Sequence, residues 1–141
     1  MSRAEANGGK NVPVIQANQI TEAIIGSAIA VHRELGPGLL ESTYEACLAY
    51  EHVQRGLKVE REIVLPIIYK GVEIHAAYRI DLLVESTVVV ELKAVEQLLP
   101  IHKAQLFSYL KLSGKKVGLL INFNSEILED GIRRVVNGLE E

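Results

Sequence analysis

One stretch decides the fold of this chain: Tyr78-Arg79-Ile80-Asp81-Leu82-Leu83-Val84-Glu85-Ser86-Thr87-Val88-Val89-Val90-Glu91-Leu92-Lys93. Two apolar runs, rich in β-branched residues, flank a polar break at residues 85–87, which is typical of a β-hairpin. The charged residues Asp81, Glu91 and Lys93 interrupt strands that otherwise look buried. Because a buried charge costs free energy unless it is paired or binds a metal ion, these three residues indicate a functional site.

The length of the hairpin loop determines whether the two acids can meet. Side chains alternate across a strand, so Glu91 and Lys93 share one face. A two-residue loop would oppose Asp81 to Val90 and put Glu91 on the wrong side. A three-residue loop, Glu85–Thr87, would oppose Asp81 to Glu91. A site built from all three charged residues therefore requires an odd-length loop or a bulge.

Helical periodicity appears before and after the hairpin. The predicted helices span residues 19–35, 41–55 and 100–112. Gly36-Pro37-Gly38 would end the first of them and turn the chain. In the second, a capping box is expected, in which the Glu45 side chain reaches back to the Ser42 amide. Pro100 would open the third helix.

The remaining apolar runs predict strands at residues 63–69, 74–84, 88–93 and 117–122. Residues 131–136 fit either an edge strand or the end of a helix. The first three strands would form an antiparallel meander, and the helical crossover can deliver the last strand parallel to the third. The order helix, helix, three strands, helix, strand indicates an α/β fold with a mixed sheet flanked by helices.

Composition is typical of a soluble globular protein. The 141 residues are 48% hydrophobic and 23% charged, with a formal net charge of −3. We expect one domain over residues 18–141 after a flexible tail at residues 1–17, which shows no periodicity. The net charge does not by itself attract nucleic acid. A lone cysteine, Cys47, and the lack of a signal-type segment or of a run near ~18 apolar residues predict a cytoplasmic protein without a membrane contact.

Asp81 and Glu91 have the chemistry of a divalent-cation site. Two carboxylates held close repel each other, and one would otherwise take up a proton. Mg²⁺ needs only one or two carboxylates and a carbonyl, for which the backbone oxygen of Leu92 is a candidate. Lys93 could lower the pKa of a water nucleophile or hold the scissile phosphate, which describes metal-assisted phosphodiester hydrolysis. A surface hairpin with an ordinary Glu–Lys pair would explain the same residues without a site.

Further motifs accompany the triplet. They are Val31-His32-Arg33-Glu34-Leu35-Gly36-Pro37-Gly38, Gly38-Leu39-Leu40-Glu41-Ser42-Thr43-Tyr44, His102-x-x-Gln105-x-x-x-Tyr109-Leu110 and Gly118-Leu119-Leu120-Ile121-Asn122-Phe123. Together with the triplet, over about residues 20–137, they resemble the GxxExxY family of the PD-(D/E)xK nuclease superfamily. Ile80 stands where the namesake proline would be, a departure that many members share.

This resemblance implies a restriction-endonuclease-like fold and hydrolysis of DNA, or less readily RNA, with Mg²⁺ or Mn²⁺. By their motif positions, Asp81 and Glu91 match metal-binding acids and Lys93 matches the catalytic lysine. Glu41 matches an acid supplied by a helix beside the sheet, directly or through water, although the helix dipole alone would also favour it there. Gln105 matches a polar residue on the helix after the lysine strand.

Four other residues are supporting candidates with structural alternatives. His102 and Tyr109 share a helix face with Gln105, which fits either a site wall or a solvated face. Tyr44 could hydrogen-bond a site carboxylate or pack with another partner for its hydroxyl. His32 fits a structural hydrogen bond more readily than a ligand role.

Two interpretations of the activity fit the sequence, and one oligomeric state is expected. The alternative to a nuclease is a catalytically weak or inactive binding or regulatory module with the same fold. A short domain contacts little of a nucleic acid duplex, so a homodimer is expected because it would extend the contact surface.

Overall fold

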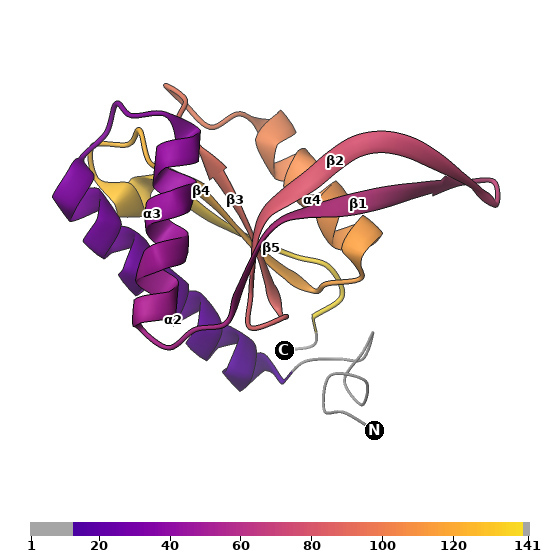
Figure 1. Ribbon diagram of the computed structural model, residues 1–141, viewed down its shortest axis with the longest axis horizontal. Coiled ribbons are helices and arrows are strands. Elements are labelled where there is room, and N and C mark those ends of the chain that lie inside the picture. Colours follow the sequence, from indigo (N-terminus) through magenta and orange to yellow (C-terminus); the bar gives the residue numbers. More distant parts are fainter. Residues whose placement is uncertain (1–12, 140–141) are drawn as a thin grey trace.

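Residues 13–139 are described by the computed structural model, in which one five-stranded sheet carries helices on both faces (Figure 1). The helices are α2 (Val14–Leu35), α3 (Glu41–Gln54) and α4 (Pro100–Ser113), and a 3-10 turn, η1, spans Leu128–Gly131. The strands are β1 (Val59–Tyr69), β2 (Val72–Val84), β3 (Val88–Lys93), β4 (Val117–Asn122) and β5 (Ile132–Val136).

The sheet has the mixed topology that the sequence predicts. Its strand order is β1-β2-β3-β4-β5. The β1–β2, β2–β3 and β4–β5 pairs are antiparallel, and β3 pairs with β4 in parallel after the crossover through α4. The restriction-endonuclease-like α/β arrangement is confirmed. Residues 132–136 form an edge strand, so the first of the two alternatives for this segment is the correct one.

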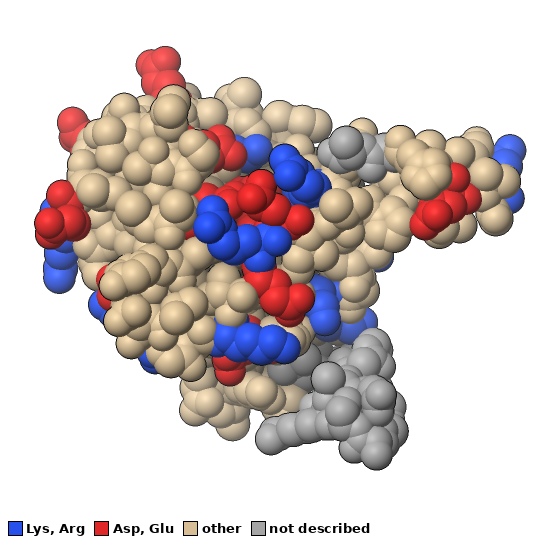
Figure 2. All heavy atoms as spheres, viewed as in Figure 1, with Lys and Arg blue, Asp and Glu red and all other residues tan. Residues whose placement is uncertain are grey.

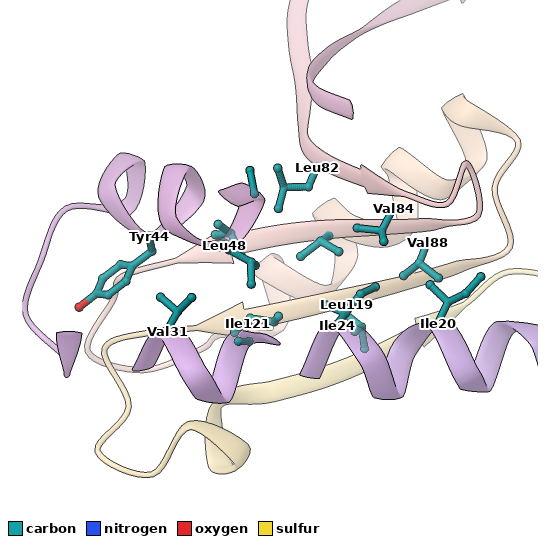
Figure 3. Close-up of a cluster of buried hydrophobic side chains, with 14 of the residues drawn as sticks. Ile20, Ile24, Val31, Tyr44, Leu48, Leu82, Val84, Val88, Leu119 and Ile121 are labelled. Atoms are coloured by element: carbon teal, nitrogen blue, oxygen red, sulfur yellow. The ribbon is translucent and has the colours of Figure 1, made fainter. Parts of the chain in front are cut away.

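Two hydrophobic clusters hold the layers together. The larger lies between the sheet and the α2–α3 pair, where Ile24, Tyr44 and Leu48 pack against Leu82 and Leu119 (Figure 3). The second joins α4 to the other face of the sheet and includes the buried side chains of Ile80, Leu83, Val89, Leu106, Leu110 and Leu120. β3 and β4 are covered on both faces, which explains why they read as nearly continuous apolar runs.

Helix α2 begins at Val14 rather than at residue 19. Residues 14–17 of the predicted tail are thus part of the helix. Ala17 is buried and extends the apolar face that continues with Ile20 and Ile24, which explains the earlier start. Residues 1–12 of that tail lie outside the described residues. By length and composition α2 could cross a membrane, contrary to our expectation that no segment comes near this limit. Its apolar face instead packs in the larger cluster, as in a core helix.

The predicted capping box of α3 is wrong. The helix begins at Glu41, with Leu40 at the N-cap and no side-chain cap bond, so Ser42 already lies inside the first turn. The Glu45 side chain does not return to the helix start but forms an ion pair with Arg61 of β1, with 3.0 Å between Oε2 and the guanidinium nitrogen. Glu45 is thereby directed toward the sheet.

The strands β1 and β2 continue past the sheet as a two-stranded ribbon, which we call the arm (residues 66–77; Figure 1). The pairing shifts register between Leu65 and Ile67 at the start of the arm. Ile68, Tyr69, Val72 and Ile74 are exposed there. The arm leaves the sheet beside α4, so its base forms a wall next to that helix.

Candidate active site

Asp81 and Glu91 meet across the β2–β3 hairpin as the odd-length loop predicts. The register pairs Val84 with Val88 and Leu82 with Val90, which leaves the three-residue loop at residues 85–87. Asp81 and Glu91 follow next on this register. Each carboxylate accepts a backbone hydrogen bond from the opposite strand. In the first of these bonds, the Asp81 N–H donates to Glu91 Oε2 at 2.8 Å.

The return bond completes this reciprocal arrangement: the Leu92 N–H donates to Asp81 Oδ2, also at 2.8 Å. Side-chain oxygens thus replace backbone carbonyls as acceptors at this point, and no backbone pair continues the β2–β3 ladder beyond Leu82 and Val90 among the described residues. The two carboxylates therefore lie where the backbone pairing of β2 with β3 ends.

A break in strand alternation creates this opening. Leu82 packs in the α2–α3 cluster, whereas Ile80, two residues earlier, packs in the α4 cluster. Regular alternation would put both on one face, so the strand rotates at Asp81. On the neighbouring strand, Glu62 adopts a φ of 51°, a left-handed conformation that costs free energy for a residue other than glycine.

Burial strongly perturbs the acid pair. Glu91 is only 5% exposed. Burial, followed by the charge of Asp81, raises the pKa of Glu91 to about 8. Burial also raises the pKa of Asp81 to about 6, against the opposing effect of its hydrogen bond from Leu92. Two acids that resist ionisation together favour either a shared proton or a bound cation.

The backbone of β3 presents a further oxygen to this pair. The Lys93 carbonyl accepts from the Phe123 N–H on the β4 side of the strand. Because successive carbonyls alternate in direction along a strand, the Leu92 carbonyl points to the β2 side, toward Asp81. This direction agrees with the Leu92 N–H, which donates to Asp81. The predicted carbonyl ligand therefore faces the acids.

Lys93 lies on the same face of β3 as Glu91 and is held by α4. Its Nζ donates to Gln105 Oε1 at 3.1 Å. Tyr109, one turn further along α4, is 7% exposed. Burial, and then the charges of Glu91 and Asp81, raise the pKa of the Tyr109 hydroxyl, which shows that it lies within electrostatic reach of the acids. Gln105 and Tyr109 thus form the α4 wall of the site.

Glu41 and Glu45 approach the acids from the first turns of α3. The charges of both raise the pKa of Asp81, and that of Glu45 has the larger effect. Glu41 is exposed, and its charge also raises the pKa of Glu91. Figure 2 shows acidic and basic side chains gathered in the middle of this face, between α3 and the start of the arm.

Two of the supporting candidates, Tyr44 and His32, have structural roles. The Tyr44 hydroxyl donates to the Gly36 carbonyl at 2.6 Å, and its ring stacks on Phe123 with 4.6 Å between centroids. His32 bonds through Nε2 to the Ser125 carbonyl at 2.7 Å, which ties α2 to the loop after β4. These bonds do not involve the acid pair, and they fit the structural alternative given for each of the two residues.

His102 caps the helix that carries Gln105. Its Nδ1 accepts a hydrogen bond of 2.9 Å from the Leu99 N–H at the helix start. Of the polar face predicted on α4, Gln105 and Tyr109 therefore reach the site, and His102 stabilises the first turn.

The sequence interpretation missed the Glu45–Arg61 pair. The spacing of Glu45, four residues after Glu41, places both on one face of α3 and was the available signal.

The donor set fits a hard cation with few protein ligands. Within residues 13–139, no group of three or more His, Cys, Asp or Glu side chains is arranged to hold a metal ion. Two carboxylates and a carbonyl are nevertheless sufficient for Mg²⁺, which retains several waters. One oxygen of each acid, Oδ2 of Asp81 and Oε2 of Glu91, is already bonded to a backbone N–H. These bonds orient both carboxylates in the opening.

Sequence comparison decides the family. A family model described as the PD-(D/E)XK nuclease superfamily matches residues 18–135. The chain belongs to this superfamily. The superfamily assignment covers all five strands apart from the last residue of β5 and includes every residue of the candidate site. No curated protein shows significant similarity to the chain.

One solved structure is also similar to this superfamily member. It is described as "Crystal structure of SSO0001", is 22% identical in sequence, and aligns over 86% of this chain and 67% of that chain with a TM-score of 0.41. Superfamily membership indicates nuclease-type chemistry and a nucleic acid substrate, and divalent metals are general in the superfamily.

Proposed function

We propose that this protein is a metal-dependent phosphodiester hydrolase that cleaves nucleic acid, with DNA as the preferred substrate over RNA. The observation that carries the proposal is the convergence of Asp81, Glu91 and Lys93 at one opening in the sheet. Lys93 shares a face of β3 with Glu91, and Gln105 holds its ammonium group there. Superfamily membership supports nucleic acid as the substrate.

Asp81, Glu91 and the Leu92 carbonyl are the groups that would hold Mg²⁺ or Mn²⁺, and Glu41 would contribute through water. The cation would supply a Lewis acid for the phosphoryl oxygens and would lower the pKa of a water nucleophile. The raised pKa values of both acids support this assignment, because a cation restores the ionised form that burial disfavours.

The chain's own groups divide the remaining work. The Lys93 ammonium would stabilise the negative charge that develops on the phosphate, and its bond to Gln105 orients it for this task. The two backbone N–H donors orient the acids so that little reorganisation is needed when substrate binds. Glu45, held by Arg61, adds negative potential that favours a cation at Asp81.

A cleavage assay with a matched lysine control tests the proposal. Single-stranded DNA, duplex DNA and RNA are incubated with Mg²⁺ or Mn²⁺ and the wild type, Lys93→Ala or Lys103→Ala. Lys103 is an exposed residue of α4, so its loss leaves the site intact. We expect Lys93→Ala to lower cleavage at least ~100-fold and Lys103→Ala to leave it near wild type. Cleavage that survives Lys93→Ala would point to a contaminant.

Calorimetry provides a readout that does not depend on cleavage. Mn²⁺ is titrated into the wild type and into the Asp81→Asn and Glu91→Gln variants. We expect one bound ion in the wild type and much weaker binding in both variants. Unchanged binding in both variants would remove these acids from the metal site.

A further inference from the structure

A groove lies beside the acid pair, between α4 and the base of the arm. Its volume is about 550 Å³. The lining residues are Ile67 and Tyr78 from the β1–β2 pair and Gln105, Ser108, Tyr109, Lys111 and Leu112 from α4. The proposed hydrolysis of a phosphodiester does not by itself use this space.

The groove shares two residues, Gln105 and Tyr109, with the α4 wall of the candidate active site, and Asp81, Glu91 and Lys93 are not among its lining residues. Gln105, which lines it, accepts the hydrogen bond from Lys93. Tyr109 also lines it and lies close enough to Glu91 and Asp81 for their charges to act on its hydroxyl. A substrate with its phosphate at the acids would therefore extend its next group into this groove.

The lining suits a flat ring with polar edges. Tyr78 is 47% exposed, so a large part of this residue is accessible to a ligand. The rings of Tyr78 and Tyr109 lie 6.4 Å apart at 57°, and together they form an angled aromatic surface. The Gln105 amide and the Ser108 hydroxyl supply hydrogen-bonding groups beside the apolar side chain of Leu112. A nucleobase offers the matching combination of π-face and polar edge.

The arginines of the β1–β2 pair near the site do not favour a broad duplex contact over these strands. Affinity for duplex DNA comes largely from cations that neutralise backbone phosphates. Arg61 and Arg79 of the β1–β2 pair are instead matched with carboxylates, at 3.0 Å from Glu45 and 3.2 Å from Glu62. A phosphate approaching over these strands would meet arginines that already have carboxylate partners. Stacking of an unpaired base supplies binding that depends less on charge.

We propose that this groove binds an unpaired nucleobase next to the phosphodiester held at Asp81 and Glu91, so that the preferred substrate is single-stranded nucleic acid. A base inside a duplex is stacked on its neighbours and would have to leave the helix to enter the groove. Tyr78 is the principal stacking residue, because its ring is the exposed one. This inference rests on the proposed function.

The test compares two tyrosines of the same strand pair. Tyr78→Ala removes the groove ring, and Tyr69→Ala removes an exposed ring of the arm that does not line the groove. Binding of a fluorescent single-stranded oligonucleotide is measured by anisotropy in the Lys93→Ala background. We expect Tyr78→Ala to weaken binding roughly 10-fold or more, and Tyr69→Ala or Tyr78→Phe to leave it within about 2-fold of the parent.

Cleavage provides the second arm of the test. With Mn²⁺, the wild type is expected to cut a single strand at least about 10-fold faster than the blunt duplex of the same sequence, and Tyr78→Ala to raise KM for the single strand. Equal or faster cleavage of the duplex, or equal binding by the Tyr78→Ala and parent proteins, would overturn the inference.

Two further outcomes distinguish failure of the proposed nuclease function from failure of the groove inference. If no nucleic acid is cut in a Lys93-dependent manner, the proposed function fails, whereas the anisotropy result still reports on the groove. If sedimentation shows a dimer that Tyr78→Ala dissociates and single-stranded DNA does not, the groove belongs to a second copy of the chain and the inference is wrong.

Discussion

Lys93 and Gln105 connect the strand that carries the lysine to the helix that follows it, through a hydrogen bond of 3.1 Å from Nζ to Oε1. An ammonium on a flexible four-carbon side chain adopts many positions unless a partner holds it. The amide of Gln105 accepts without adding charge, so Lys93 retains its full positive charge toward the substrate. Gln105 is therefore a positioning residue for Lys93.

Replacing Gln105 with leucine tests this role. Gln105→Leu keeps the approximate size and removes the acceptor, so we expect kcat to fall ~10- to 100-fold while KM changes little. The matched control is Gln54→Leu, an exposed residue at the end of α3, which should behave as wild type. Gln105→Asn should recover part of the loss. A Gln105→Leu enzyme with wild-type kcat would mean that Lys93 is positioned by other groups.

The acid pair predicts an inverse dependence of stability on pH in the absence of metal. The pKa values of Asp81 and Glu91 are raised to about 6 and about 8, above the ~4 of the unfolded chain. The folded state therefore binds protons more tightly, so the pair favours folding most below about pH 4. That contribution is lost as pH rises through about 8, on the order of a few kcal/mol. Thermal unfolding in EDTA should show Tm falling as pH rises from about 6.5 to about 8.

Two comparisons identify the pair as the cause of this slope. Glu91→Gln should flatten the pH dependence, whereas Glu96→Gln, at an exposed loop position, should leave it unchanged. Mn²⁺ should raise Tm more at pH 8 than at pH 5, because the ionised pair binds the cation. A slope that persists in Glu91→Gln would assign it to other groups.

Local patterns were sufficient to predict the hairpin and the relation of its acids. The apolar runs and the three-residue loop at residues 85–87 determine the register, and both are visible in sequence. The position of Lys93 beside Glu91 follows from alternation alone. The rotation of β2 at Asp81 could not be predicted, because Ile80 and Leu82 are both apolar and the sequence does not distinguish which cluster each one joins.

Tertiary contacts decided what the sequence left open or misassigned. The start of α3 depends on the turn that Tyr44 holds through Gly36, so the local Ser42–Glu45 capping pattern was misleading. Gly131 precedes β5 in a close turn where a Cβ would collide with the Ser125 side chain and the Asn122 backbone. This packing of Gly131 against Ser125 and Asn122 places residues 132–136 beside β4. The periodicity of residues 131–136 alone does not indicate such a contact.

Tyr44 should stabilise the turn before α3 through its hydroxyl. The hydroxyl donates to the Gly36 carbonyl and accepts from the Leu39 N–H at 3.0 Å, inside a fully buried residue. Tyr44→Phe retains the stacking on Phe123 and leaves both backbone groups without this partner, so it should lower the free energy of unfolding by ~1–3 kcal/mol. Urea denaturation measures the loss. Tyr50→Phe, at a residue 66% exposed, is the control and should cost little.

His52 predicts a second pH effect, on the acid side. Its residue is 0% exposed, and neither ring nitrogen has a hydrogen-bond partner within the described part of the chain. Burial, and then the charge of Arg55, lowers the pKa of His52 to about 4. The unfolded chain therefore binds the proton more readily, so stability should fall as pH drops from about 6.5 toward 4, by ~2–3 kcal/mol in all.

His52→Leu separates this effect from the opposite one of the acid pair. The substitution removes two buried polar atoms that lack partners among the described residues and fills similar space with apolar atoms. We expect equal or higher stability at pH 7 and the loss of the acid-side decline, which leaves stability rising as pH falls because of Asp81 and Glu91. The same substitution at the exposed His75 should leave the wild-type pH profile intact. The decline between pH 6.5 and 4 is assigned to protonation of the buried, neutral His52. A His52→Leu protein that still loses stability in this window would show that the decline has another origin.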